Sequence, residues 1–330
     1  MDWKVFAIVI SSVVGAVALA FAVLAIVSRK VYNRSVMATL VALYLRLTTR
    51  HKSQEELMAD IAKSSRANDV PYSVPRRVRT RFQQTVDYHG MTVVCVNMAA
   101  SVNRAVVYLH GGAYVRQPRI YHWKYINKLA SRVGNVIVPI YPLAPNSHPM
   151  SAFSLLTELY LELKDRYGEV ILMGDSAGGG LALSLLQQWS EVGYEQPRKT
   201  ILFSPWMDVT MSNTEIERYK KIDPFVTVEG ARVWGKAWAQ DMSLNDFRIS
   251  PLYGNMKNLG EVVVYSGDRE ILYPDFCRLR DKMKDSANFK FVVGRGMNHV
   301  YQVYPIPEAR KALDEVVREI SEPFLFIQFE

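Results

Sequence analysis

Cysteine is scarce in this 330-residue sequence, where Cys95 and Cys277 are the only two. Two cysteines cannot build a disulfide framework or a cysteine-rich zinc site, and they favour a reducing compartment. The chain also has only 18 Gly and 15 Pro, which excludes a collagen-like or low-complexity protein. With 49% hydrophobic and 11% aromatic residues, it has the material for a large packed core and is not a disordered chain.

Acidic residues are few between Arg29 and Arg81, a stretch that contains twelve Lys and Arg but only four Asp and Glu. This stretch therefore accounts for the net charge of +8 of the whole chain. A nucleic-acid-binding function would rest on that charge alone. Because the basic residues follow a long apolar run, they favour an anionic lipid surface, although a solvated helical face explains them equally well.

The apolar run extends from Val5 to Val27, 23 residues without a charge. A membrane-spanning helix needs about 20 such residues, and a soluble helix is rarely apolar on all faces for this length. A signal peptide is the alternative, since small residues suitable for cleavage occur at Gly15, Ala16, Ala18 and Ala20. Lysine and arginine remain in the cytoplasm, and they are more numerous after the run than before it. The sequence thus predicts a single-pass cell-membrane protein whose large domain after the run is cytoplasmic, on the evidence of Lys4 before the run and Arg29, Lys30 and Arg34 after it.

Helical and strand-like segments alternate after the apolar run. Residues 36–67 have the pattern of helices, and from there short Val- and Ile-rich runs predict buried strands at Thr92–Asn97, Ala105–Leu109, Val136–Ile140, Val170–Met173, Ile201–Phe203, Val262–Tyr265 and Phe291–Val293. Helical patterns separate them, including Ala152–Leu163, Leu181–Trp189, Asp275–Lys284 and Glu308–Ile320. This alternation predicts an α/β fold with a mainly parallel sheet flanked by helices.

The same patterns divide the chain into three parts. Residues 1–34 form the predicted anchor with its basic flank, residues 35–75 a helical cap or linker, and residues 76–330 the α/β domain, which contains the motifs described next. Residues 207–253 have no convincing strand. They are therefore interpreted as a helical insertion that contributes to a lid over the site.

A candidate nucleophile lies in Gly174-Asp-Ser176-Ala-Gly178, which fits the pattern G-x-S-x-G. The motif follows a strand pattern and precedes a helical one, which is the context of a nucleophile elbow. Glycines suit the tight turn, and the helix N-terminus behind Ser176 would favour a developing oxyanion. Upstream, His110-Gly-Gly-Ala113 directly follows another strand pattern, where glycines let backbone N–H groups face an acyl oxygen.

The candidate base is His299, the only one of the six histidines that follows Ser176. Its acid partner should come between the two, and Asp268 is favoured because it directly follows a strand and a Ser-Gly turn. Glu270 is the rival, and Asp275 is a more distant option. The order Ser, Asp, His is that of α/β-hydrolases. Chymotrypsin-like proteases share the Gly-Asp-Ser-Ala-Gly-Gly run but place His and Asp before Ser on an all-β fold.

Five motifs in this order resemble the hormone-sensitive-lipase-like family of α/β-hydrolases, which includes bacterial carboxylesterases and arylacetamide deacetylases: His110–Ala113, Gly174–Gly178, Ser204–Asp208, Ser250–Tyr253 and Gly267–Glu270. The resemblance covers about residues 101–320. It implies an α/β-hydrolase fold with a helical cap and a serine esterase without metal or organic cofactor. Its implied catalytic residues are Ser176 as nucleophile, Asp268 as acid and His299 as base, with oxyanion donors at Gly111, Gly112 and Ala177. His110 would be structural.

The chain departs from the family pattern at two places. Ala113 replaces a third glycine, and Tyr141-Pro-Leu-Ala-Pro-Asn146 lacks an Arg and a Glu found in the family. The predicted function is hydrolysis of small-molecule or lipid carboxylic esters through an acyl-enzyme, as in carboxylesterases and lipases. An amidase or deacetylase of the same fold, or a non-catalytic ligand-binding homologue, is the alternative.

Overall fold

A computed structural model describes residues 3–49, 51–99 and 102–322 of the chain. Its centre is an eight-stranded sheet in the order β1-β2-β4-β3-β5-β6-β7-β8. The strands are β1 (Gln83–Tyr88), β2 (Met91–Val96), β3 (Arg104–Leu109), β4 (Val136–Pro139), β5 (Glu169–Asp175), β6 (Lys199–Phe203), β7 (Glu261–Gly267) and β8 (Phe289–Gly294). Strands β1 and β2 are antiparallel to their neighbours, and the others pair in parallel. The predicted α/β-hydrolase fold with a mainly parallel sheet is therefore confirmed.

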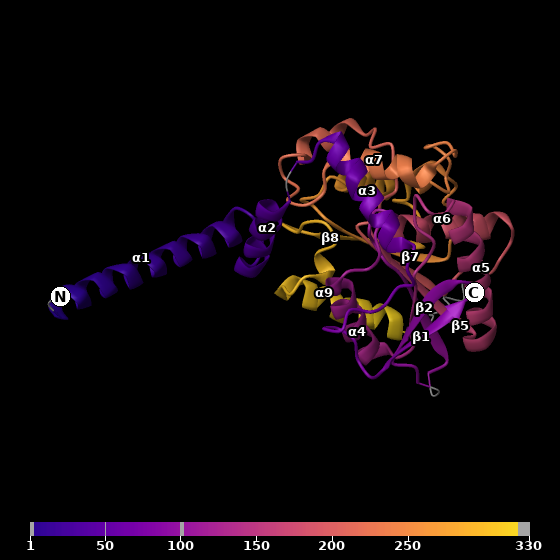
Figure 1. Ribbon diagram of the computed structural model, residues 1–330, viewed down its shortest axis with the longest axis horizontal. Coiled ribbons are helices and arrows are strands. Elements are labelled where there is room, and N and C mark those ends of the chain that lie inside the picture. The colour runs from indigo at the N-terminus through magenta and orange to yellow at the C-terminus, as the bar shows by residue number, and fades with distance from the viewer. Residues whose placement is uncertain (1–2, 50, 100–101, 323–330) are drawn as a thin grey trace.

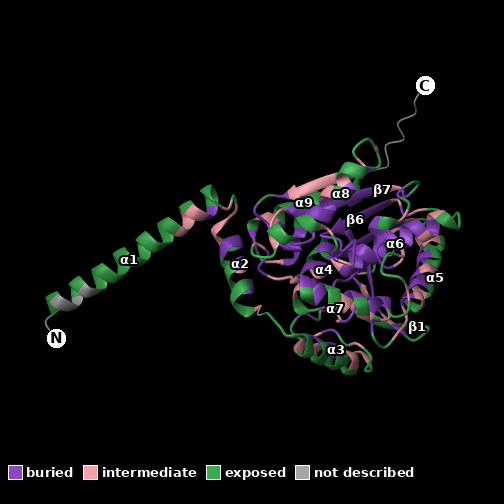
Figure 2. Cartoon of the chain, turned by 90° about the horizontal axis from the view of Figure 1, so that it is seen from above, coloured by how far each residue is buried: buried purple, intermediate pink, exposed green. Residues whose placement is uncertain are grey.

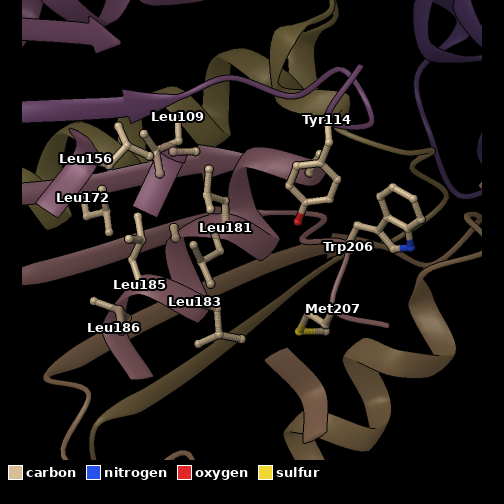
Figure 3. Close-up of a cluster of buried hydrophobic side chains, with 14 of the residues drawn as sticks. Leu109, Tyr114, Leu156, Leu172, Leu181, Leu183, Leu185, Leu186, Trp206 and Met207 are labelled. Atoms are coloured by element: carbon tan, nitrogen blue, oxygen red, sulfur yellow. The ribbon is translucent and has the colours of Figure 1, made fainter. Parts of the chain in front are cut away.

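Helices cover both faces of the sheet. Helices α4 (Ile120–Val133) and α9 (Pro307–Ser321) pack on one face, and α5 (Pro149–Tyr167), α6 (Ala177–Glu191) and α8 (Tyr273–Lys282) pack on the other. Figure 3 shows part of the hydrophobic core on the face covered by α5, α6 and α8, where Leu109 and Leu172 from strands pack with Leu156 of α5 and Leu181 of α6. Strands buried on both faces are apolar throughout, which is why their patterns were readable in the sequence.

The strand that the sequence patterns missed is β1. Its residues, QQTVDY, are mostly exposed, and its single ladder partner is β2. An edge strand with one exposed face need not be apolar, so its sequence resembles a loop. The seven predicted strands are all present, within a few residues of the predicted bounds.

Residues 207–253, the predicted insertion, contain the short helices η1 (Thr214–Tyr219) and η2 (Pro251–Tyr253), helix α7 (Val228–Ala239) and no strand, as predicted. Helix α7 packs against α3 (Gln54–Asn68), which comes from far upstream. Figure 1 shows these two helices side by side at the top of the molecule. A third short helix, η3 (Tyr301–Val303), follows the loop that carries His299.

The first helix, α1 (Trp3–Lys30), projects from the globular body in both views and is exposed over most of its length (Figures 1 and 2). Its segment Ile10–Lys30 is long and apolar enough to cross a membrane. Helix α2 (Val36–Thr48) lies at the base of α1 and begins after a five-residue joint, residues 31–35. A membrane anchor and a signal sequence both have these properties of length and composition.

Candidate active site

Ser176 occupies the sharp turn between β5 and α6. Its backbone has φ 53° and ψ −119°, a conformation that costs about 1–3 kcal/mol for a residue other than glycine. Three backbone hydrogen bonds stabilise it: the Ser176 N–H donates to the Phe203 carbonyl at 2.8 Å, and the Ser176 carbonyl accepts from the N–H groups of Trp206 and Gly180 at 2.9 and 3.0 Å. This geometry directs the Ser176 side chain away from the sheet, as in a nucleophile elbow.

His299 lies against Ser176, with its Nε2 atom 2.9 Å from Ser176 Oγ. On the other side of the ring, Nδ1 contacts Oε2 of Glu270, a fully buried carboxylate. The hydrogen bond to Glu270 assigns the proton to Nδ1 and leaves Nε2 as the acceptor for the Ser176 hydroxyl. Burial opposes a charge on His299, but the carboxylates of Glu270, Asp223 and Asp175 together outweigh burial and raise the pKa of the imidazole above its ordinary value.

The predicted pairing of Asp268 with His299 is wrong. Asp268 directly follows β7, but its Oδ1 accepts a hydrogen bond of 2.7 Å from the Gly296 N–H. The chain then turns, and Glu270 reaches back so that its Oε1 accepts from the Gly267 N–H at 2.9 Å and the Ser266 hydroxyl at 2.5 Å. This leaves Oε2 facing His299. Asp275, the more distant option, instead bonds Asn213 at 2.9 Å.

The predicted oxyanion donors separate into two groups. The Gly111 N–H donates to Asp175 Oδ1 at 3.0 Å, so it is already occupied and the prediction for this residue does not hold. In the described part of the chain, the N–H groups of Gly112 and Ala177 donate to no protein atom. Ala177 is the first residue of α6, where free N–H groups and the helix dipole favour an anion.

Asp175 fixes the loop that contains Gly111. This buried carboxylate accepts from the Tyr108 hydroxyl at 2.8 Å, from Gly111 and, at 3.2 Å, from His122 Nε2. Burial opposes its charge, but these partners hold the pKa of Asp175 below its usual value. A Cβ atom on Gly111 would lie 2.2 Å from Asp175 Oδ2, so only glycine fits there. His110, predicted to be structural, stacks on Tyr141 with ring centroids 4.6 Å apart.

Asp223 is a residue of the site that the sequence motifs did not reveal. It lies in the insertion, and its Oδ2 accepts from the Ile271 N–H at 2.9 Å, next to Glu270. Its Oδ1 accepts from the N–H groups of Phe225 and Val226 at 2.7 and 3.0 Å. The Phe225 ring stacks near His299, with centroids 6.4 Å apart. Burial raises the pKa of Asp223 to about 6. Asp223 therefore joins the insertion to the turn that carries Glu270.

Comparison with known proteins agrees with this geometry. The sequence model of the alpha/beta hydrolase fold family matches residues 106–303, more than half of the chain. The chain belongs to this family. A serine on an elbow, a histidine on a loop before the last helix and a buried acid after β7 occur here in the order of that fold.

Two curated relatives have the names of ester hydrolases. A triacylglycerol lipase of Mycobacterium tuberculosis is 32% identical over 251 residues, which cover 71% of this chain and 52% of the lipase. The chain therefore spans about half the length of that relative. An esterase of Acinetobacter venetianus is 28% identical over 229 residues, covering 67% of this chain and 76% of the esterase. These relatives support an esterase- or lipase-type hydrolase.

Solved structures share the fold over most of the chain. A Staphylococcus aureus protein superposes with a TM-score of 0.79 and 28% sequence identity, over 83% of this chain and 95% of that protein. An esterase from the bacterial hormone-sensitive lipase family superposes with a TM-score of 0.73 at 23% identity, over 87% and 98% of the two chains. The resemblance predicted from the five motifs is thus confirmed.

Proposed function

We propose that this protein is a serine hydrolase that cleaves carboxylic esters through an acyl-enzyme intermediate. The observation that carries the proposal is the continuous chain from Ser176 Oγ to His299 Nε2, at 2.9 Å, and from His299 Nδ1 to the buried carboxylate of Glu270. A serine hydroxyl is a weak nucleophile until a neighbouring base accepts its proton. The three groups have the spacing and order that this activation requires.

In the acylation step, His299 Nε2 takes the proton of Ser176 as Oγ forms a bond to the ester carbonyl carbon. The carbonyl π electrons move to the oxygen, and Gly112 and Ala177 donate N–H groups to that oxyanion. When the tetrahedral intermediate collapses, the bond to the leaving alkoxide breaks and His299 returns the proton to it. Glu270 stabilises the imidazolium formed in between.

In the deacylation step, a water molecule attacks the acyl carbonyl carbon and gives its proton to His299 Nε2. The second tetrahedral intermediate uses the same N–H donors. Its collapse breaks the bond between the acyl carbon and Ser176 Oγ, and His299 protonates the serine. The carboxylic acid leaves, and the enzyme returns to its starting state. Fluorophosphonate labelling, followed by mass spectrometry of the modified peptide, tests whether Ser176 is the activated nucleophile.

The same proposal assigns a cap to residues 35–75 and 207–253. Packing of α3 on α7 supports it, because these helices come from the two segments and lie on the same side of the body. Phe225 supports it as well, since a residue of the insertion stacks near His299. The acyl or alcohol part of the substrate would contact residues of this cap.

We also propose that α1 is an uncleaved membrane anchor and that the catalytic domain is cytoplasmic. The observations behind it are the segment Ile10–Lys30, which is long and apolar enough to cross a membrane, and the basic residues that follow the uncharged run Val5–Val27, namely Arg29, Lys30 and Arg34. Protease treatment of intact cells carrying a C-terminal epitope should leave the epitope undigested until the membrane is permeabilised. Digestion without permeabilisation would reverse the orientation, and a mature soluble form without the first thirty or so residues would show a cleaved signal.

The pH dependence of activity follows from His299, which must be neutral to accept the serine proton. Because its pKa is raised above 6.5, kcat/KM for a soluble ester should fall as the pH decreases through a midpoint above 6.5. Asp223 contributes to that raised pKa, so Asp223→Asn should move the midpoint to lower pH. Asp268→Asn is the matched control and should leave it in place. A wild-type midpoint below 6.5 would contradict the assignment.

A further inference from the structure

Helix α2 has an apolar face that no other described part of the chain covers. Met37, Leu40, Leu43, Tyr44 and Leu47 form this face, and between 42% and 77% of each side chain is exposed. They recur at helical spacing and so lie along one side of α2. The opposite side, with Ala38, Ala42 and Leu45, is buried against the body. We call the exposed side the apolar face of α2.

Such a face is unusual for a helix on the surface of a soluble protein. The outward side of a surface helix is normally polar, and contiguous exposed apolar patches mark sites of interaction. A second apolar surface lies nearby on α1, which is separated from α2 by five residues and leaves the body at the N-terminal end of α2 (Figures 1 and 2). Along α1 the side chains of Leu19, Phe21 and Ile26 are each at least 60% exposed.

The charges around the two helices fit a lipid surface. The sequence contains no Asp or Glu from Trp3 to Gln54. Arg29 and Lys30 are exposed at the end of α1, and Arg46 is exposed near the end of α2. An apolar face bordered by cations is typical of helices that lie in the interface of a bilayer, where the cations meet lipid phosphates.

Helix α2 is also attached to both sides of the catalytic site. At its start, Arg34 Nη1 donates to the Gly296 carbonyl at 3.2 Å, three residues before His299. Packing is tight there, because a Cβ atom on Gly296 would lie 2.1 Å from the Tyr32 carbonyl oxygen. Towards the end of α2, Arg46 Nη2 donates to the carbonyl of Lys221 at 2.9 Å and to that of Ile222, next to Asp223.

A second pair of contacts fixes the start of α2. The Ser35 N–H and hydroxyl donate to the two carboxylate oxygens of Glu308, at 2.6 and 2.9 Å. These contacts thus hold α2, and with it the apolar face, in place against the His299 loop and the insertion. Whatever the apolar face docks on lies beside the catalytic site.

From these contacts we propose that the apolar face of α2 docks in the interface of an anionic lipid bilayer, so that the Ser176 site acts on esters dissolved in that bilayer. This inference rests on the proposed serine esterase function and names its substrate class, lipid esters with long acyl chains. Helix α1 provides the tether, and α2 sets how the body sits on the membrane. Substrate then reaches the site without passing through bulk water.

The experiment uses the full chain reconstituted in vesicles of phosphatidylcholine and phosphatidylglycerol. The test variant carries Leu40→Gln, Leu43→Gln and Leu47→Gln. The matched control carries Leu161→Gln, Val192→Gln and Tyr194→Gln, which alter three exposed apolar residues on other elements. Each protein is assayed on p-nitrophenyl acetate in solution and on dioleoylglycerol within the vesicles.

The test variant should lose about tenfold or more of its activity on dioleoylglycerol, because interfacial binding scales with the apolar area inserted. Its activity on the soluble ester, and both activities of the control, should stay within about twofold of wild type, as expected for surface substitutions. Equal loss on both substrates, or no loss on either, would overturn the inference. Wild-type activity on the soluble ester alone would overturn the substrate class.

A second measurement does not depend on catalysis. Leu43→Cys and Leu161→Cys, each made in a Cys95→Ser, Cys277→Ser background, are labelled with an environment-sensitive fluorophore. Brominated acyl chains should quench the label at position 43 and leave the one at position 161 unchanged. Absence of quenching at position 43 would overturn docking. If wild type hydrolysed neither ester while position 43 was quenched, the proposed function would fail and docking would stand.

Discussion

Replacement of Ser176 by alanine is expected to abolish ester hydrolysis and to leave the protein folded. The loss should approach about 10⁶-fold in kcat, the size found when the nucleophile of a well-studied serine hydrolase is removed. The fold should survive because the Ser176 side chain has one partner in the described structure, His299 Nε2, and the elbow's backbone hydrogen bonds do not involve it. Steady-state kinetics on a soluble ester, with circular dichroism, would measure both effects.

Ser184→Ala is the matched control, since Ser184 lies in the same helix that follows the elbow and bonds the Phe247 carbonyl, away from His299. It should remain active, and it should still be labelled by a fluorophosphonate, whereas Ser176→Ala should not. If purified Ser176→Ala kept more than a few per cent of wild-type activity, free of contaminating esterase, another residue would be the nucleophile.

The second large effect is expected for Glu270→Gln, which should lower kcat by about 10⁴-fold, as loss of the orienting carboxylate does in a known triad. The Gly267 N–H and the Ser266 hydroxyl both donate to Oε1, so they would hold the amide oxygen of glutamine at that position. The amide NH₂ would then face His299 Nδ1 and donate to it. That places the ring proton on Nε2, where it blocks acceptance of the serine proton.

Asp268→Asn is the comparison that separates the two acidic residues. Its amide oxygen can still accept from the Gly296 N–H, so the loop before His299 should keep its shape and kcat should change little. The kinetics of both variants on one soluble ester decide between them. A large loss for Asp268→Asn together with a mild one for Glu270→Gln would return the acid role to Asp268.

The case of Glu270 shows what the sequence could and could not predict. The pairing of Ser176 with His299 could be predicted from the sequence. Patterns of a strand, a tight turn and a helix surround Ser176, and only one histidine follows it in the chain. The acid depends on how the turn after β7 directs two side chains, which position along the chain does not determine. The bond from the Gly267 N–H to Glu270, which fixes that direction, is visible only in the folded chain.

The other differences between the sequence predictions and the structure also arise from contacts between distant segments. Gly111 lies in the predicted loop, but its N–H is used by Asp175, a contact between residues 64 positions apart. Asp223 comes from an insertion without a motif, and its bond to the Ile271 N–H exists only once the insertion folds over the body. Local sequence patterns therefore predict the helices, the strands and the turn that carries Ser176. Hydrogen bonds between distant segments must be observed in the folded chain.

The joint of residues 31–35 has a consequence for the kinetics of the enzyme. The N–H groups of Tyr32 and Arg34 donate to the carbonyls of Val27 and Ser28 in α1, while Arg34 and Ser35 also bond the Gly296 carbonyl and Glu308. The joint is therefore not a loose linker, and a membrane-spanning α1 would hold the active site at one height above the bilayer. Encounters with substrate then occur in two dimensions. Rates should follow the mole fraction of ester in the leaflet and its lateral diffusion, and inert lipid added at constant ester should slow the enzyme by surface dilution.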